Sequence, residues 1–183
     1  MRAAKSLIST DQARVADGSL TGVVAINHDE AATEVLDAFR ITTLRTWRGR
    51  GGFYITNSRL KSAAGSDFRY WQHGRVIDVA CATTQLIQQT FISAGVRTNS
   101  DGTIDERDAV RLEEKVESAL RAKLTQPTSA EGTPGHVSAL SYSIDRTNNV
   151  QSTEAIIGVV AIRPLGYTKF ITTTIGFALN TGA

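Results

Sequence analysis

The sequence predicts an α+β fold: a mixed or antiparallel sheet ending in a three-strand meander, packed against two main helices, with an extended C-terminal arm strand. Two observations carry this prediction. Apolar residues recur at three- and four-residue steps over residues 75–92 and again over residues 103–120, as on helices buried along one side. Short segments rich in β-branched residues lie before and after these helices and are bounded by glycine-containing turns.

Length and composition are those of one soluble domain. The chain has 183 residues, of which 41% are hydrophobic and 21% charged, and it contains no apolar run long enough to span a membrane. Its single cysteine, Cys81, fits a reducing compartment and is expected to be a buried small hydrophobe. We expect an N-terminal arm or leader at 1–20, a core domain at 21–166 and a C-terminal strand or arm at 167–183.

The elements before the long helices are short. The sequence predicts a strand at 22–27, a helix over 30–39 capped by Asp29, and strands at 41–47 and 53–57 joined across a glycine-rich turn.

The two long helices have recognisable ends. Gly95 is the natural stop of the first, and its apolar stripe includes Cys81. The second begins with a capping box formed by Thr103 and Glu106. Its predicted buried stripe consists of Ala109, Leu112, Val116, Ala119 and Leu120. Three glutamates, Glu113, Glu114 and Glu117, lie off that stripe.

The C-terminal stretch is the most distinctive part of the chain. Residues 155–162 are apolar without a break, which is typical of a strand buried on both faces. A type I turn is predicted at 163–166, after which apolar residues alternate along one face: Tyr167, Ile171, Ile175, Phe177 and Leu179. Fully extended, residues 167–179 would span roughly 43 Å, whereas the radius of gyration of a compact chain of this length is about 16 Å. This strand therefore either closes its own sheet or pairs with another molecule.

Charge is unevenly distributed although the net charge is only +2. Residues 40–75 are strongly basic and include Arg45, Arg48 and Arg50, whereas residues 101–117 are strongly acidic. A polyanionic ligand would account for the basic part, but self-association of identical copies accounts for both.

No catalytic, cofactor-binding or metal-binding residues are expected. The loop at 97–108 resembles part of a calcium-binding loop, but its first ligand position is Arg97 and its twelfth is Asp108 instead of glutamate. The glycines at 49–52 match no phosphate-binding motif, and the three histidines lack metal-ligand spacing. Aromatic residues among the arginines of 40–75 could stack nucleic-acid bases, although an aromatic core edge with a basic rim explains them as well.

Six short segments are informative through their order along the chain: Thr43–Trp47, Gly52–Asn57, Gly65–Phe68, Arg75–Asp78, Val116–Leu120 and Arg163–Tyr167. In that order they resemble the C-terminal part of contractile-tail sheath proteins, which build the sheaths of myophages and related injection machines. Sheath proteins are usually much longer, so the chain departs from the family in size.

The resemblance implies an α+β domain whose terminal arms add strands to the sheets of neighbouring subunits. It implies a non-enzymatic structural subunit, or a fragment of one, that assembles with itself into rings or tubes and meets an inner tail tube and a baseplate. Such a protein would be made in the bacterial cytoplasm and reside in the tail of the particle, with no cofactor, membrane or nucleic acid. The alternatives are a nucleic-acid-binding module using residues 40–75 and another tail or baseplate component. The candidate subunit-interaction residues are Tyr167, Ile171, Ile175, Phe177, Leu179, Arg45, Arg48, Arg50, Glu113, Glu114 and Glu117.

Overall fold

The computed structural model describes residues 6–63, 65–126, 135–169 and 171–173. The predicted α+β class is confirmed. Helical and extended elements follow one another as η1 (Val15–Asp17), η2 (Glu30–Ala32), α2 (Thr33–Ala38), β1 (Leu44–Trp47), β2 (Arg50–Ile55), α3 (Trp71–Gln89), α4 (Glu106–Leu124), β3 (Val137–Ile144), α5 (Val150–Thr153) and β4 (Gly158–Pro164). The strands form two antiparallel hairpins, β1–β2 and β3–β4.

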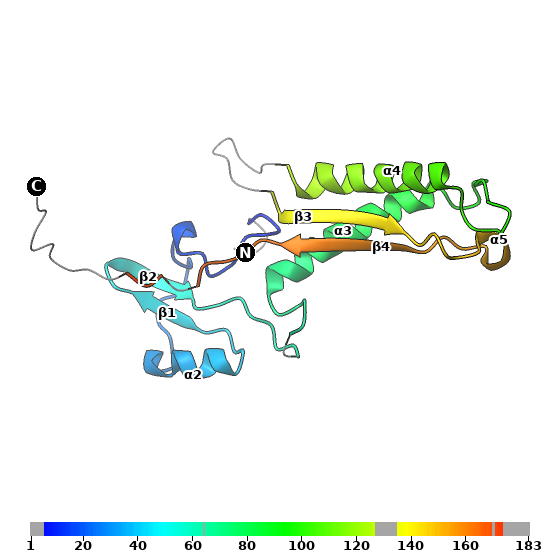
Figure 1. The fold of residues 1–183 in the computed structure, drawn as a ribbon. Helices are drawn as coiled ribbons and strands as arrows, with labels where there is room; N and C mark the ends of the chain where they lie inside the picture. The colour runs from blue at the N-terminus through cyan, green and yellow to red at the C-terminus, as the bar shows by residue number, and fades with distance from the viewer. Residues whose placement is uncertain (1–5, 64, 127–134, 170, 174–183) are drawn as a thin grey trace, which may run out of the picture.

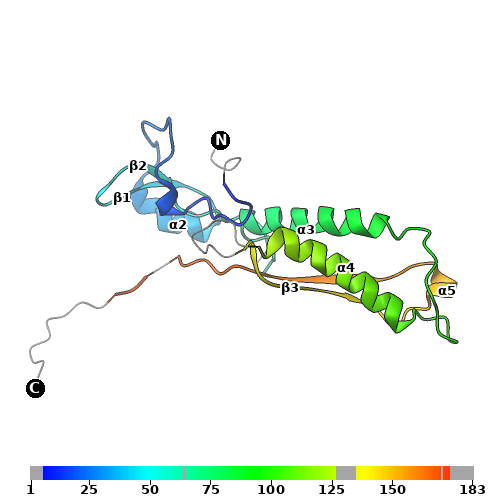
Figure 2. The same ribbon diagram turned by 90° about the horizontal axis from the view of Figure 1, so that it is seen from above.

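These elements lie in two lobes (Figure 1). The smaller lobe holds η2, α2 and the β1–β2 hairpin, and the larger holds α3, α4 and the β3–β4 hairpin. In Figure 2, α3 runs along one side of the β3–β4 hairpin and α4 crosses the line of β3. The two helices and the hairpin share one hydrophobic core. Within the described parts of the chain, no helix is long and apolar enough to cross a membrane.

The smaller lobe largely follows the local sequence signals. Asp29 caps the predicted helix by accepting a hydrogen bond from the backbone N–H of Ala31, at 2.9 Å. In the β1–β2 hairpin Trp47 pairs with Arg50, and the turn between them uses Gly49 at a φ of 77°, which favours glycine. The strand predicted at 22–27 is wrong: residues 23–27 form no strand, and none of the described strands pairs with them.

Helix α3 begins at Trp71, four residues before its predicted start, because Gly74 lies inside the helix instead of preceding it. Its buried side chains are Gln72, Val76, Ala80 and Thr84, which recur at four-residue steps. Cys81 is exposed, which corrects the expectation that it is buried. One residue along a helix turns the side chain by about 100°, which carries Cys81 off the stripe through Ala80.

Helix α4 carries the best-predicted core. Four of the five stripe residues are buried and the fifth, Ala119, is half-buried; the buried ones are Ala109, Leu112, Val116 and Leu120. The predicted capping box of Thr103 and Glu106 is wrong. Asp105 is the cap, and its carboxylate accepts from the N–H of Arg107 at 2.9 Å. Asp101 binds Thr103 instead, through a hydrogen bond of 2.7 Å from the Thr103 hydroxyl.

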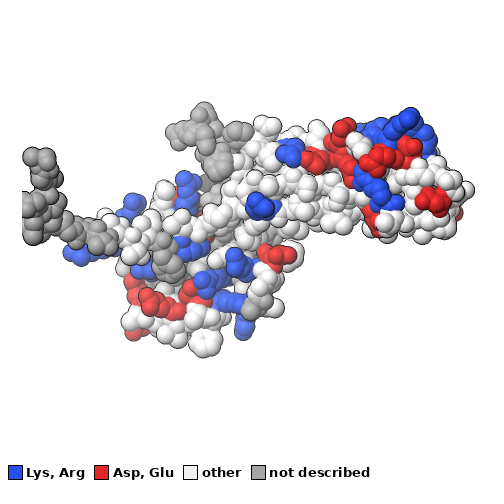
Figure 3. All heavy atoms as spheres, in the orientation of Figure 1, with Lys and Arg blue, Asp and Glu red and all other residues white. Residues whose placement is uncertain are grey.

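The β3–β4 hairpin covers α3 and α4 with one face only. Cross-strand partners Leu140–Ile162 and Tyr142–Val160 turn their side chains toward the helices. Strand β4 is therefore not buried on both faces, since Val159 on its other face is 61% exposed. An apolar run without polar interruption does not reveal that only alternate residues are covered. The uncovered face appears in Figure 3 as a band that is largely free of charged side chains.

The third strand of the predicted meander is absent from the described residues. The chain continues past Pro164 without the predicted turn, and residues 165–169 and 171–173 form no strand; residue 170 and residues 174–179 lie outside the described residues. Figures 1 and 2 show this segment continuing beyond the end of β4, away from α5. Two contacts with the N-terminal segment fix that direction: the Tyr167 hydroxyl donates to the carbonyl of Ser9 at 2.6 Å, and Lys169 forms an ion pair with Asp11.

Candidate subunit interface

The β3–β4 hairpin has two outer edges, and hydrogen-bond alternation defines which backbone groups point outward. Residues directly opposite one another in an antiparallel pair alternate between exchanging hydrogen bonds and exchanging none. The N–H of Asp145 donates to the carbonyl of Ile157 at 2.8 Å, so odd-numbered residues bond across the hairpin. The even-numbered residues turn their N–H and C=O groups outward, at Leu140, Tyr142 and Ile144 on β3 and at Gly158, Val160 and Ile162 on β4.

Side chains of α4 occupy the outer edge of β3. The N–H of Ile144 donates to Glu113 at 2.6 Å, and the N–H of Tyr142 donates to Glu117 at 3.4 Å. Arg121 donates to the carbonyl of Leu140 at 3.4 Å. The helix therefore supplies hydrogen-bond partners that a neighbouring strand would otherwise provide.

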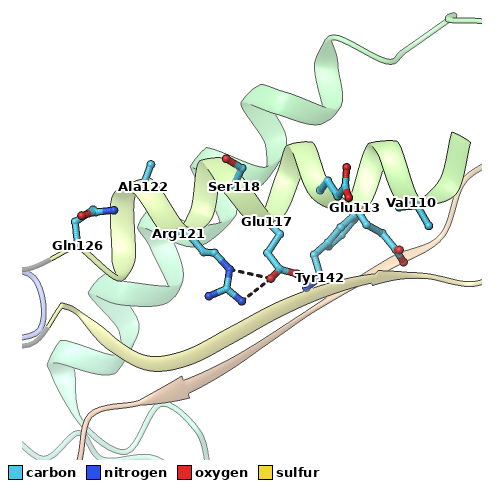
Figure 4. Close-up of a pocket in the computed structure, with 9 residues that line it drawn as sticks. Val110, Glu113, Glu117, Ser118, Arg121, Ala122, Gln126 and Tyr142 are labelled. Atoms are coloured by element: carbon cyan, nitrogen blue, oxygen red, sulfur yellow. Dashed lines mark hydrogen bonds and ion pairs between the residues drawn. The ribbon is translucent and has the colours of Figure 1, made fainter. Parts of the chain in front are cut away.

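The predicted acidic residues thus differ in role. Glu113 pairs with Arg146, which holds the pKa of the Glu113 carboxyl below its usual value of 4.5 against the opposing effect of burial. Glu117 accepts from Nε of Arg121 at 2.8 Å, the pair drawn in Figure 4. Only Glu114 is exposed and has no ion-pair partner among the described residues. These side chains border an open hollow of about 510 Å³ along α4 (Figure 4).

The outer edge of β4 is different because it borders two hollows, one of which is also lined by Asp67 and Arg69. Two hollows, of about 550 and 440 Å³, lie between β4 and α3. Ile77, Val160 and Ile162 line both, so together they follow the strand edge with a mostly apolar floor. Cys81 lines the second hollow.

The predicted basic residues lie together on the β1–β2 hairpin, in the lobe that does not contain α4. The guanidinium of Arg45 stacks on the Trp47 ring, 4.3 Å from its centroid. Arg48 and Arg50 are exposed, and neither forms an ion pair with another described residue. The structure therefore groups the three arginines but does not bring them to the glutamates of the same chain.

The C-terminal candidates are only partly described. Tyr167 is half-buried, and burial, with the nearby charge of Asp11, raises the pKa of its hydroxyl to about 12. Ile171 is 85% exposed. Ile175, Phe177 and Leu179 lie outside the described residues.

Sequence reasoning missed the partners of these residues. Arg121 lies four residues after Glu117, a helical ion-pair spacing that the sequence does contain. Arg146 and Lys169 carry no such signal, because their partners are distant in sequence. The 97–108 loop is closed by Arg97, whose guanidinium donates to Asp108 at 2.8 Å, so the two end positions of the calcium-like pattern bind each other. No cluster of potential metal ligands occurs among the residues described.

No protein-family model and no curated protein matches the sequence. Solved structures do match. A chain in the baseplate of the anti-feeding prophage (AFP) superposes with a TM-score of 0.65 and 15% identity over 97% of this chain. A chain in the contracted AFP helical sheath superposes with a TM-score of 0.57 and 16% identity over 87% of this chain. A chain in the contracted PVC sheath complex of an extracellular contractile injection system superposes with a TM-score of 0.59 and 13% identity over 97% of this chain.

The chain spans a little under half of each of these structures, between 43% and 48% of their length. At such identities the likeness concerns the fold. The predicted resemblance is confirmed at that level: the chain has a fold found in sheath and baseplate chains of contractile injection particles.

Proposed function

We propose that the protein is a structural, non-enzymatic subunit, or part of one, of a contractile phage-type tail sheath, in which neighbouring copies hold each other by exchanging strands. The observation that carries this proposal is the fold likeness over 87–97% of the chain to sheath and baseplate chains. A second support is the C-terminal segment, of which the described residues, 165–169 and 171–173, belong to no strand. The inner tail tube and the baseplate are the further partners, and the particle tail, assembled in the bacterial cytoplasm, is the location.

A baseplate component is the second candidate, because the match with the highest TM-score of the three is a baseplate chain. A sheath subunit polymerises with itself along a tube, whereas a baseplate component forms a closed ring. Electron microscopy of the purified full-length protein distinguishes them. Tubes of stacked rings are expected for the sheath, single rings would favour the baseplate, and monomers at all concentrations would contradict both.

The structure offers little to the nucleic-acid alternative. Several arginines of residues 40–75 are engaged within the chain: Arg59 pairs with Asp37 at 3.4 Å, and Arg75 lies over the Trp71 ring at 4.8 Å. Binding that depended on this segment would weaken steeply with salt. In a fluorescence-anisotropy titration, we expect the protein to show no salt-dependent binding to labelled duplex or single-stranded DNA.

Charge complementarity between copies is tested best at Glu114. Substituting Glu113 or Glu117 would also remove hydrogen bonds to the backbone of β3. We expect Glu114→Lys to weaken assembly at low salt while leaving the melting temperature unchanged, and Glu114→Gln to have a smaller effect. Unaltered assembly of Glu114→Lys would show that this charge is only solvated.

A further inference from the structure

The two lobes in Figure 1 are joined by polar contacts instead of a shared hydrophobic core. The buried residues that form the core belong to α3, α4, the β3–β4 hairpin and the loop before α4, all in the larger lobe. The described helices and strands of one lobe make no extensive contact with those of the other. Units joined in this way are expected to move relative to one another. Whatever fixes the angle between the lobes therefore lies in the segments that connect them.

Residues 6–20, here called the strap, contact both lobes. At the start of the strap, Arg75 of α3 donates a hydrogen bond to the carbonyl of Ser6 at 3.3 Å. At its end, the N–H of Leu20 donates to the carbonyl of Phe53 on β2 at 2.8 Å. The strap therefore runs from the larger lobe to the smaller one, beside the chain that links β2 to α3.

We propose that the strap fixes the angle between the two lobes, and that the Asp11 carboxylate is the positioning group on which this depends. This inference goes beyond the proposed function, because it concerns a single chain and holds whether or not copies assemble.

Asp11 lies within the strap and is only 7% exposed. Its Oδ1 atom accepts a hydrogen bond from the Ser58 hydroxyl at 2.7 Å, and its Oδ2 atom forms the ion pair with Lys169. Ser58 belongs to residues 56–70, which link the two lobes, and its carbonyl accepts from the N–H of Trp71 at 3.0 Å. One buried carboxylate therefore holds together the strap, the link between the lobes and the C-terminal segment.

The surroundings of Asp11 make its charge necessary. Burial acts to raise the pKa of this carboxyl, but hydrogen bonds from Lys169 and Ser58 keep it below its usual value of 3.8. A buried charge that loses its partner is strongly destabilising, so the pair separates only if both groups reach solvent. Neutralising Asp11 should therefore release Ser58 and Lys169, while the two ends of the strap stay attached to their lobes.

Double electron–electron resonance on the full chain measures the distance between the lobes. One nitroxide is attached to Cys81 on α3, which is exposed and is the only cysteine, and the other to Arg48→Cys on the exposed tip of the β1–β2 hairpin. Dilution with unlabelled chain removes distances between copies. We expect a single narrow distance peak in the otherwise unchanged chain. In Asp11→Asn that peak should be lost and replaced by a broad distribution.

A second label pair and a second variant control for general loosening of the fold. Labels on Cys81 and Glu114→Cys both lie in the larger lobe, so their distance peak should stay narrow in Asp11→Asn. Asp17→Asn removes a carboxylate of the same type from an exposed position on the strap and should leave the peak between the lobes narrow. A merely stabilising role of Asp11 would lower the melting temperature without broadening that peak.

Lys169→Glu tests the ion pair from its other side. It places a second carboxylate beside Asp11, so the two repel and the peak between the lobes should broaden. Lys169 lies outside the described helices and strands, so this variant decides if Asp11→Asn does not melt cooperatively.

Three outcomes would overturn the inference. The first is a narrow peak at unchanged distance in a folded Asp11→Asn or Lys169→Glu chain. The second is a distribution between the lobes that is already broad with Asp11 in place, and the third is equal broadening by Asp17→Asn. None of these outcomes bears on the proposed function, which rings or tubes in electron micrographs decide independently.

Discussion

Ending the chain after Lys169 removes the predicted donor strand while keeping the contacts that anchor its root. The Tyr167 bond to Ser9 and the Lys169 pair with Asp11 both remain. Of the described residues, only 171–173 are lost, and Ile171 is 85% exposed. Full burial of such a side chain is worth about 1.5–3 kcal/mol, so its loss should cost no more than about 0.5 kcal/mol of folding free energy.

The opposite arrangement predicts a much larger effect. If Ile175, Phe177 and Leu179 filled the chain's own core, removing them would cost roughly 5–9 kcal/mol, comparable to the whole stability of a domain. The assay is a thermal melt beside size-exclusion chromatography with light scattering. We expect the melting temperature to change by less than about 4 °C and the assembly to disappear. Loss of the cooperative melt would refute the reasoning.

A second truncation, after Leu165, is the matched control for the anchor. It also removes Tyr167, which is half-buried, and the Lys169–Asp11 ion pair. Hydrogen bonds from Lys169 and Ser58 lower the pKa of Asp11 although burial alone would raise it, so the native fold uses this carboxylate in its charged form. We expect this chain to melt measurably below the one ending at Lys169.

Four further outcomes are expected. Gly158→Ala would place a Cβ 2.1 Å from the Tyr142 hydroxyl, and the forced shift should lower stability by about 1–3 kcal/mol, read as a melting temperature lower by roughly 3–10 °C. Arg146→Met leaves the Glu113 carboxylate without its partner and should cost about 1–2 kcal/mol in urea unfolding after allowance for solvent exposure. The pKa of Glu113 is lowered from 4.5, so the stability that this carboxylate contributes is present above pH 4.5 and is lost as pH falls through its pKa in the folded protein. The free energy of unfolding of Arg146→Met should therefore fall less steeply with decreasing pH than that of the wild type. Isothermal titration should detect no calcium binding tighter than about 10⁻⁴ M, because Arg97 occupies the first ligand position.

The sequence was most informative where structure depends on local periodicity. The stripe from Ala109 to Leu120 was predictable because a helix packed on one side repeats every three to four residues. The helix cap was ambiguous, since Thr103 and Asp105 are both good caps two residues apart and only the backbone conformation decides between them. The turn predicted after Arg163 was overridden by contacts made 158 residues away in sequence, between Tyr167 and Ser9.

The candidate interface needed tertiary information. The sequence predicted that Glu113 and Glu117 lie off the buried stripe of α4. It did not predict that α4 runs along β3, where both carboxylates accept hydrogen bonds from the β3 backbone. Likewise, Val160 and Ile162 read as core residues, and only the pairing of β4 with a single strand shows that their N–H groups face a hollow. Edges are set by which strands are neighbours, and short-range patterns do not encode that.

A mixing experiment tests strand exchange between copies most directly. The chain ending after Lys169 lacks the proposed donor strand but keeps the edge of β4. The variant Ile162→Pro keeps the donor strand but loses an N–H group that faces outward from that edge. Each should be monomeric alone by native mass spectrometry, and an equimolar mixture should yield a one-to-one heterodimer and nothing larger. A mixture that stays monomeric, or either variant assembling by itself, would contradict the account.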